Sequence, residues 1–258
     1  MATFLFDKTI FGPVKSRRLG VSLGINLLPN SRKVCNFNCI YCECGWTPQK
    51  QGNERLPSAL EVTRQLEAKL LEMSSHSITP DVITFAGNGE PTLHPDFYKI
   101  TSEVIRLRNQ YCPEAKIALL SNATTLKKKG VIEAMQKIDK YILKLDSGIE
   151  KTCIRLNKPI GKFSLSILIN QLKGIHKKLT IQTLFIKGMY EGELIDNTSM
   201  QEIDAWLKLI DTIKPEEVMV YTIDRDTPVK GLTKVPLPEL KRIALLVEER
   251  GFKATVSS

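Results

Sequence analysis

Residues 33–45 read KVCNFNCIYCECG and hold four of the six cysteines of this chain within ten positions. Cys35, Cys39 and Cys42 form a C-x3-C-x2-C pattern, and Cys44 follows after one more residue. So many thiols on one short loop indicate a disulfide-linked loop, a zinc site or an iron–sulfur site. The rest of the sequence distinguishes among these three kinds of site, and the kind of site in turn indicates which fold to expect.

The composition is that of a globular protein. The chain has 258 residues, of which 42% are hydrophobic and 25% are charged, and no apolar run approaches the roughly 18 residues that span a bilayer. Its first residues, MATFLFDKTIFGPVKSRR, place apolar residues before basic ones, which is the wrong order for a secretory signal. We therefore expect a cytoplasmic protein without membrane association, and because cytosolic thiols stay reduced, a disulfide loop is disfavoured.

The net charge is +9, with an isoelectric point near 9.2. This excess is compatible with a polyanionic partner such as RNA, or with an acidic redox protein. The alternative is a basic surface without a partner, since Lys127 to Lys129 read as a solvated helix face.

Strand-like and helix-like segments alternate along the whole chain. The expected strands cover residues 20–28, 81–87, 116–122, 140–146, 180–188 and 216–224, and the expected helices cover 57–73, 94–110, 125–138, 164–179, 200–212 and 237–251. Residues 253–256 could add an edge strand. We therefore expect six β/α units in one domain spanning residues 1–258, with a loop at about 29–56 that carries the cysteines.

Strands this rich in Ile, Leu and Val are typical of a parallel sheet with both faces covered. A doubly wound open sheet and a partial (β/α)6 barrel both fit the alternation. In either architecture the functional loops follow the carboxyl ends of the strands. The cysteines and the segments GNGEPTLHP, SNATT, LDSG, IKG and TIDRDTP all fall at such positions.

A structural zinc site usually clamps two separate chain segments, each with a pair of ligands. Here all four cysteines lie in one loop, and none of His76, His94 and His176 is placed as a second clamp. Three thiolates on one loop can instead bind three irons of a cubane cluster and leave the fourth open. Zinc stays open as the alternative at this point.

The pattern Cys35, Cys39 and Cys42, with the aromatic Tyr41 before the last cysteine, resembles the signature of the radical S-adenosylmethionine (radical SAM) enzymes. The resemblance implies that the three cysteines bind a [4Fe–4S] cluster whose fourth iron is chelated by S-adenosylmethionine. One electron would then release a 5′-deoxyadenosyl radical, which abstracts hydrogen from a substrate. The resemblance also implies an α/β fold, a partial (β/α)6 TIM-like barrel of parallel strands with outer helices.

The other strand ends extend this resemblance. AGNGEP resembles the glycine-rich segment of the family, in which backbone groups around Gly87, Asn88 and Gly89 and the Glu90 carboxylate would meet the methionyl ammonium. Further residues would bind the cofactor or line its cavity, and these are Ser121, Asn122, Lys144, Arg155, Gln182 and Thr183. The candidates for substrate contact or catalysis are Asp146, Tyr221 and Asp224.

The flanking segments look most similar to the branch that contains the tRNA wyosine-synthesis enzymes, in which Ser16, Arg17 and Arg18 match a shared segment. Those enzymes carry a second set of cysteines, whereas Cys112 and Cys153 read as small buried side chains. The substrate therefore stays open among a tRNA base, a peptide and a small metabolite. The resemblance also implies a low-potential electron donor, a flavodoxin or ferredoxin. Two other functions remain: a zinc-bound interaction or RNA-binding module without radical chemistry, and a plain electron carrier or other cofactor-binding α/β protein.

Overall fold

The structure is a computed structural model that describes residues 4–16, 19–49, 55–175 and 178–257. It divides into two compact units. The N-terminal unit comprises residues 5–35 and 47–141, and the C-terminal unit comprises residues 1–4, 36–46 and 142–258. Arg17 and Arg18, which the sequence matched to a family segment, lie outside the described residues.

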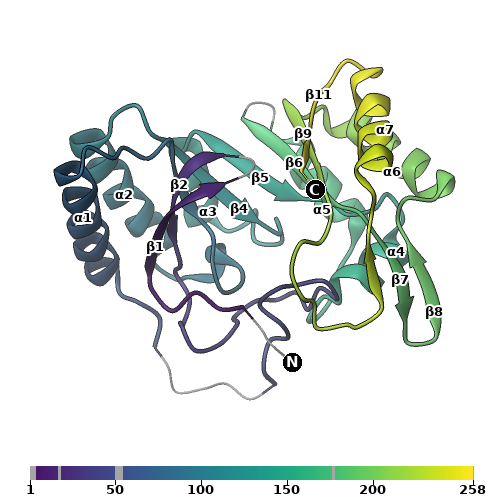
Figure 1. Cartoon of the computed structure of the whole chain (residues 1–258), viewed down its shortest axis with the longest axis horizontal. Helices are drawn as coiled ribbons and strands as arrows, with labels where there is room; N and C mark the ends of the chain where they lie inside the picture. Colours follow the sequence, from purple (N-terminus) through teal and green to yellow (C-terminus); the bar gives the residue numbers. More distant parts are fainter. Residues whose placement is uncertain (1–3, 17–18, 50–54, 176–177, 258) are drawn as a thin grey trace. The chain divides into compact units, whose positions relative to one another are not determined.

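The N-terminal unit contains strands in the order β1-β2-β3-β4 (Figure 1). Strands β2, β3 and β4 are parallel, and β1 is antiparallel to β2. The strands are β1 (Ile10–Ser16), β2 (Gly20–Ile25), β3 (Val82–Phe85) and β4 (Lys116–Ser121). The helices are α1 (Ala59–Ser75), the short 3-10 helix η1 (Pro91–Leu93), α2 (Phe97–Tyr111) and α3 (Lys129–Lys137).

Local sequence signals account for these elements. All four residues of β3 are buried, as expected for a strand covered on both faces. Helix α1 begins with a capping box in which Ser58 accepts a hydrogen bond from Glu61 N, and the Glu61 carboxylate accepts one from Ser58 N. Its buried residues Val62, Leu66 and Leu70 recur at helical spacing.

The C-terminal unit contains most of β5 and the strands β6, β9 and β11, of which β6, β9 and β11 are parallel. A second sheet has the order β10-β7-β8 and is antiparallel. The strands are β5 (Lys140–Lys144), β6 (Leu179–Leu184), β7 (Ile186–Tyr190), β8 (Glu193–Asp196), β9 (Glu217–Tyr221), β10 (Leu232–Lys234) and β11 (Lys253–Ser257). The helices are α4 (Glu150–Asn157), α5 (Leu165–Lys173), α6 (Met200–Ile213) and α7 (Leu237–Glu248).

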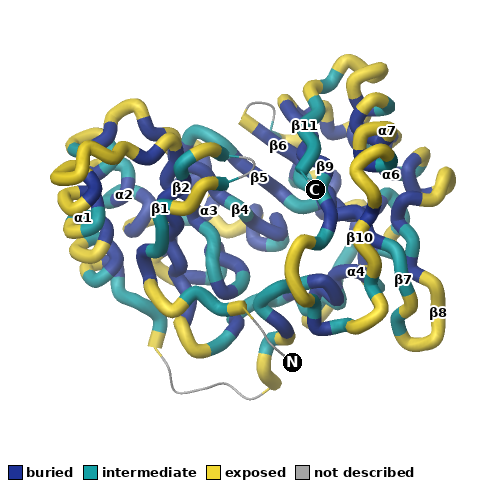
Figure 2. Tube along the Cα trace, viewed as in Figure 1, coloured by how far each residue is buried: buried dark blue, intermediate teal, exposed yellow. Residues whose placement is uncertain are grey.

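Each unit has its own apolar core. In the N-terminal unit Phe85 of β3 meets Phe97 of α2 edge to face, with ring centroids 5.3 Å apart. In the C-terminal unit Phe185 meets Trp206 of α6 in the same way at 5.4 Å. The central strands are buried, while the outer faces of the helices are exposed (Figure 2). Among the described residues, no helix combines the length and apolar character that crossing a membrane requires.

The expected alternation of six strands and six helices is confirmed, including the edge strand at the C-terminus. The structure also adds strands β1, β8 and β10 and the short helix η1, which the sequence did not predict, and three further details differ. The helix expected over 164–179 ends at Lys173, next to Gly174, a residue type with poor helix propensity. The strand expected over 180–188 is divided at Phe185, because β7 pairs in the second sheet with β8 and β10. Helix α4 follows β5 where the sequence indicated a loop.

Candidate functional site

Glu90 follows β3 in the N-terminal unit, and its side chain is buried, with 2% exposure. Its Oε1 accepts hydrogen bonds from Ser121 Oγ at 2.8 Å and from the backbone N and side-chain hydroxyl of Thr92. Its Oε2 accepts one from Asn122 N at 2.7 Å. Burial raises the pKa of Glu90, and the bonds from Asn122, Thr92 and Ser121 oppose this shift. Within the described residues, all of its hydrogen-bond donors are neutral.

The glycines beside Glu90 allow two backbone segments to approach closely. Gly89 has φ +136, and a Cβ on it would lie 1.9 Å from the carbonyl oxygen of Val34. A parallel bridge joins Val34 and Gly89, flanked by the bonds Val34 N to Asn88 O (2.9 Å) and Glu90 N to Val34 O (3.1 Å). This pairing fixes Cys35, the next residue, beside the Glu90 segment.

Gly87 has a related role, since a Cβ on it would lie 2.4 Å from Asn26 Oδ1. Asn88, in contrast, serves the fold. Its Nδ2 donates to the carbonyls of Phe6 and Pro29 at 2.9 Å each, and its Oδ1 accepts from Phe6 N at 2.8 Å. Both amide hydrogens are therefore used within the protein, and we do not retain the side chain of Asn88 as a cofactor ligand.

Asn122 connects the SNATT turn to the first predicted cluster ligand. Its Nδ2 donates to Cys35 Sγ at 3.7 Å. Its Oδ1 accepts from Thr124 N at 3.1 Å and from Thr124 Oγ1 at 2.7 Å, which fixes the orientation of the amide. Thr47 Oγ1 donates to the carbonyl of Cys35 at 3.1 Å. Ser121 and Asn122 thus lie with Glu90 and Cys35 in one unit.

Cys39 and Cys42 belong to the C-terminal unit. They occupy consecutive turns, with Cys42 N donating to Cys39 O at 3.0 Å and Gly45 N donating to Cys42 O at 2.8 Å. Cys39 is buried, with 6% exposure, whereas Cys42 is partly exposed. The side chain of Cys39 lies 3.3 Å from Asn157 Oδ1 at the end of α4.

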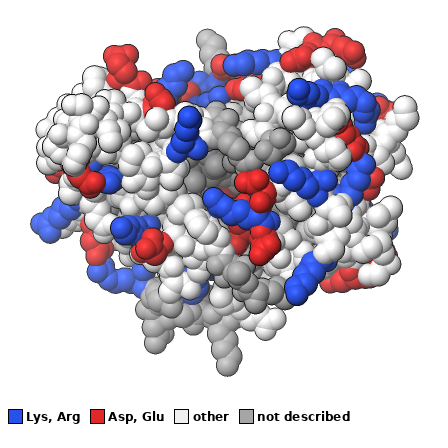
Figure 3. Space-filling view, in the orientation of Figure 1, with Lys and Arg blue, Asp and Glu red and all other residues white. Residues whose placement is uncertain are grey.

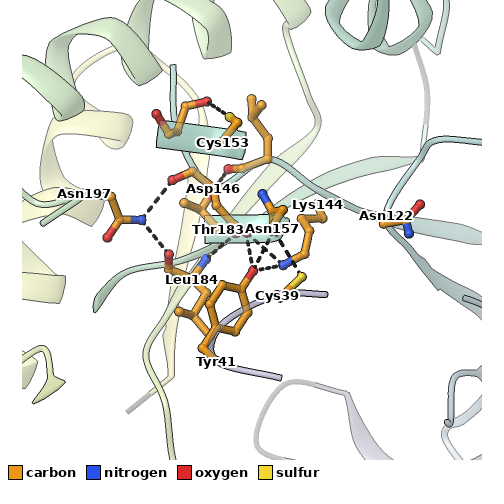
Figure 4. Close-up of polar contacts among 12 residues, drawn as sticks. Cys39, Tyr41, Asn122, Lys144, Asp146, Cys153, Asn157, Thr183, Leu184 and Asn197 are labelled. Atoms are coloured by element: carbon orange, nitrogen blue, oxygen red, sulfur yellow. Dashed lines mark hydrogen bonds and ion pairs between the residues drawn. The ribbon is translucent and has the colours of Figure 1, made fainter. Parts of the chain in front are cut away.

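Tyr41, Lys144 and Asp146 form a buried polar network (Figure 4). The hydroxyl of Tyr41 donates to Asp146 Oδ2 and accepts from Lys144 Nζ, and Lys144 Nζ also pairs with Asp146 Oδ2 at 2.9 Å. Burial and the charge of Asp146 raise the pKa of Tyr41. Burial would lower the pKa of Lys144, but the neighbouring Asp146 carboxylate raises it overall. The network therefore holds a neutral phenol beside the Lys144–Asp146 ion pair.

The backbone also holds Asp146. Its Oδ1 accepts from Leu184 N at 3.1 Å, and its carbonyl accepts from Asn197 Nδ2 at 2.9 Å. The Asp146 side chain is fully buried in these contacts, with 0% exposure. Asp146 is accordingly better placed to hold Tyr41 and Lys144 than to contact a substrate directly.

Gln182 and Thr183 cannot both line one cavity, because successive strand residues point to opposite faces. Thr183 is fully buried, donates to Leu145 O at 2.7 Å and accepts from Trp206 Nε1 of α6 at 3.1 Å. The prediction that Thr183 lines the cavity is therefore wrong, since Thr183 faces the helix. Gln182, which is partly exposed, lies on the other face of β6.

Arg155 on α4 is engaged with β8. Its guanidinium pairs with Glu193 Oε2 at 3.0 Å and lies 3.5 Å from the carbonyl of Leu194. These contacts engage the Arg155 guanidinium with the β7–β8 hairpin, so we do not retain it as a cofactor ligand.

Tyr221 is the last residue of β9, and an electrostatic interaction with it is among the smaller causes that raise the pKa values of Tyr41 and Lys144. Asp224 lies three residues further on and pairs with Lys234 at 3.5 Å. It lines a cavity of about 540 Å³ formed by the loop after β9 and by β10. The sequence analysis missed Thr92 and Asn157, although Thr92 stands inside the segment GNGEPTLHP and Asn157 lies two residues after Arg155.

The residue types suit an iron–sulfur cluster, although the described residues hold no group of three His, Cys, Asp or Glu side chains already placed to bind one metal ion. All six cysteines lie in the described residues as thiols rather than disulfides. Soft sulfur ligands suit clusters and zinc, and amide donors aimed at sulfur are common around clusters. Asn122 supplies such a donor to Cys35. Cys112 and Cys153 are buried, as the sequence predicted.

Comparisons with known proteins identify the family to which this chain belongs. The family model described as the radical SAM superfamily matches residues 30–197. A UPF0026 protein of Helicobacter pylori is 33% identical over 93% of this chain and 73% of its own length. A protein of Brachyspira hyodysenteriae named GTPase Obg is 32% identical over 86% of this chain, which spans only 31% of that protein.

Two solved structures show the fold. A radical SAM methyltransferase from Sphaerobacter thermophilus has a TM-score of 0.65 at 16% identity, covering 92% of this chain and 65% of that one. A TYW1 with a lysine-pyruvate adduct bound has a TM-score of 0.61 at 15% identity, covering 88% and 73%. The expected α/β fold, a partial barrel of mostly parallel strands, is thereby confirmed. This chain belongs to the radical SAM superfamily of enzymes, which use S-adenosylmethionine in radical chemistry.

Proposed function

We propose that Cys35, Cys39 and Cys42 hold a [4Fe–4S] cluster and that Glu90 receives the ammonium of S-adenosylmethionine. When bound, the cluster supplies the electron that cleaves S-adenosylmethionine to the 5′-deoxyadenosyl radical. In the proposed reaction that radical would abstract hydrogen from a substrate bound by this chain. We further propose that residues 1–258 form a single core domain with the cluster loop at about 29–56.

The observation that carries the proposal is the environment of Glu90. A carboxylate with 2% exposure is costly to ionise unless it is paired, and its described donors, Thr92, Ser121 and Asn122, are all neutral. Among the described residues, Glu90 Oε2 accepts one hydrogen bond, and its second lone pair can accept another. An ammonium group there would supply the missing positive charge at the strength of a charge-assisted hydrogen bond.

The remaining residues take supporting roles. Gly87 and Gly89 allow close packing against Asn26 and Val34, and Ser121 and Asn122 orient the Glu90 carboxylate. Tyr41, Lys144 and Asp146 hold the loop of Cys39 and Cys42. Gln182, Tyr221 and Asp224 stay as candidates for contact with cofactor or substrate.

The test is anaerobic reconstitution with iron and sulfide, followed by dithionite and S-adenosylmethionine. We expect iron with absorption near 400 nm, and 5′-deoxyadenosine detected by mass spectrometry. Glu90→Gln should keep the cluster but reduce 5′-deoxyadenosine formation about 100-fold or more, because a lost charge pair costs roughly 3 kcal/mol or more.

The matched control is Glu202→Gln. Glu202 is also buried and hydrogen-bonded to the neutral hydroxyls of Ser147 and Thr152, but it lies in the C-terminal unit on α6. Equal loss in both variants would contradict the assigned role of Glu90. Stoichiometric zinc without iron would instead favour the alternative, a zinc-bound interaction or RNA-binding module.

Among the open substrates, a tRNA base has the most support. The net charge of +9 favours a polyanion, and TYW1, a wyosine enzyme, is among the similar structures. Figure 3 shows lysine and arginine scattered among acidic side chains on the face it presents, so a tRNA would rely on distributed contacts there. Binding of tRNA that weakens steeply with rising salt concentration would support the tRNA base. Binding assays with peptide and metabolite pools, run in parallel, would distinguish these substrates.

A low-potential donor is the second partner we propose. Radical SAM enzymes generally need an electron donor, and an acidic flavodoxin or ferredoxin would suit a basic chain. Replacement of dithionite by reduced flavodoxin, with 5′-deoxyadenosine as the readout, tests this partner.

A further inference from the structure

We infer that two asparagine amides, Asn157 and Asn122, donate N–H···S hydrogen bonds to the cluster cysteines Cys39 and Cys35 and thereby set the reduction potential of the cluster. The inference rests on the proposed function, because it requires the cluster. It adds a role for Asn157, which the sequence did not single out, and a new role for the side chain of Asn122.

Backbone pairing places Asn157 opposite Cys39. Asn38 N donates to Lys158 O at 3.0 Å, and Ile40 N donates to Leu156 O at 2.9 Å. These two bonds flank Cys39 on one segment and Asn157 on the other. The amide and the sulfur therefore meet because of the main-chain register, with both side chains buried at 3% and 6% exposure.

The number of available hydroxyl protons determines whether Oδ1 or Nδ2 of Asn157 faces the Tyr41 hydroxyl and Cys39 Sγ. The hydroxyl of Tyr41 lies 3.2 Å from Asn157 Oδ1, and it also donates to Asp146 Oδ2 (Figure 4). A phenol has a single proton, so it cannot serve both of these acceptors fully. Lys144 Nζ donates to the same hydroxyl oxygen, which leaves one lone pair on that oxygen.

Rotation of the amide by 180° resolves the conflict. The two orientations of an asparagine amide have almost the same shape. Among the described residues, Nδ2 of Asn157 makes no hydrogen bond that would fix the amide in the orientation seen in the structure. With Nδ2 in the place of Oδ1, one amide hydrogen donates to Tyr41 and the other to Cys39 Sγ. A cysteine that ligates iron is a thiolate and can only accept, so this orientation also suits the loaded site.

Asn122 shows the same relationship in the N-terminal unit without any rotation. Its Oδ1 is held by the N and Oγ1 of Thr124, so its Nδ2 faces Cys35 Sγ at 3.7 Å. Two amides, on separate elements, thus direct donors to two of the three predicted ligands. Hydrogen bonds to cluster sulfurs favour the more negatively charged, reduced state and raise its potential.

The first experiment needs no variant. The protein is labelled with asparagine carrying ¹⁵N only at the side-chain amide, reconstituted anaerobically, reduced with dithionite and examined by pulsed electron paramagnetic resonance. We expect ¹⁵N couplings to the reduced cluster. A reduced cluster without any such coupling would overturn the inference, whatever the variants do.

The second experiment compares reduction potentials. Asn157→Leu and Asn122→Leu should each lose part of the ¹⁵N coupling and lower the equilibrium constant for reduction about tenfold, which is about 59 mV for one electron. Asn109→Leu, the same exchange at an exposed position on α2, should leave the potential unchanged. If Asn157→Leu and Asn122→Leu both bind the cluster and keep the reduction potential of the parent protein, the inference is overturned but the proposed function is not. A protein that binds no iron would overturn the proposed function as well.

Discussion

Gly89 lies directly against the backbone of Val34, so that a Cβ on Gly89 would be 1.9 Å from the Val34 carbonyl oxygen. The two residues are far apart in the sequence, yet their pairing sets Cys35 beside Glu90 within the N-terminal unit. A glycine is required here for space as well as for its φ of +136.

We expect Gly89→Ala to lower the free energy of unfolding well beyond the cost of a strained φ alone, which is about 1–3 kcal/mol. The control is Gly192→Ala, where φ is +77 but no atom lies within 4 Å of the added Cβ. Urea unfolding measures both variants, and iron content after reconstitution should fall only in Gly89→Ala. Equal destabilisation of the two would mean that the contact with Val34 has no consequence.

The ion pair of Lys144 and Asp146 should be strongly coupled. Asp146→Asn leaves the ammonium of Lys144, with a 16% exposed side chain, beside Tyr41 without its carboxylate. Breaking a buried pair in this way costs about 3–5 kcal/mol. The double variant Lys144→Met with Asp146→Asn should recover part of that loss in thermal or urea unfolding, and a simple sum of the two single effects would argue against the coupling.

The capping box of α1 predicts a pH dependence. Hydrogen bonds from the Ser58 backbone and from Arg55 lower the pKa of Glu61 from 4.5 to about 2. Because the folded pKa lies below the ordinary one, the ionised carboxylate stabilises the fold above pH 4.5, and this contribution disappears as the pH falls from 4.5 to about 2. The stability difference between the parent and Glu61→Gln should therefore shrink over that range, since glutamine keeps the cap without the charge. A difference independent of pH would contradict this assignment.

The thiols should differ in reactivity. Burial and the nearby Asp146 charge raise the pKa of Cys153 to about 12, and burial raises that of Cys112. With iodoacetamide at pH 8, both should react slowly until the protein is denatured, while the partly exposed Cys42 and Cys44 react in the apo-protein.

Cluster loading should then protect Cys35, Cys39 and Cys42 but leave Cys44 reactive. Peptide mass mapping of the alkylated cysteines measures both effects. Protection of Cys44 in the loaded protein would show that the ligand set has been assigned incorrectly.

The sequence by itself determined the elements and the type of chemistry. The periodic apolar residues of α1, the buried run of β3 and the turns between them depend on neighbours in the chain, and these signals are legible without a structure. The resemblance of Cys35, Cys39, Cys42 and Tyr41 to the radical SAM signature likewise indicated the family, because such a motif lies in one short loop that the sequence displays directly.

Only the tertiary structure decided which polar side chains meet. Glu90, Ser121 and Asn122 were expected together and lie together, because parallel strands end at one edge. Asn88, Thr183 and Arg155 stood in equally suggestive segments, yet they bond to Phe6, Trp206 and Glu193. Asn157 lies beside Cys39 because of a backbone register with residues more than a hundred positions away. Such partners are fixed by packing between distant segments, which no local pattern records.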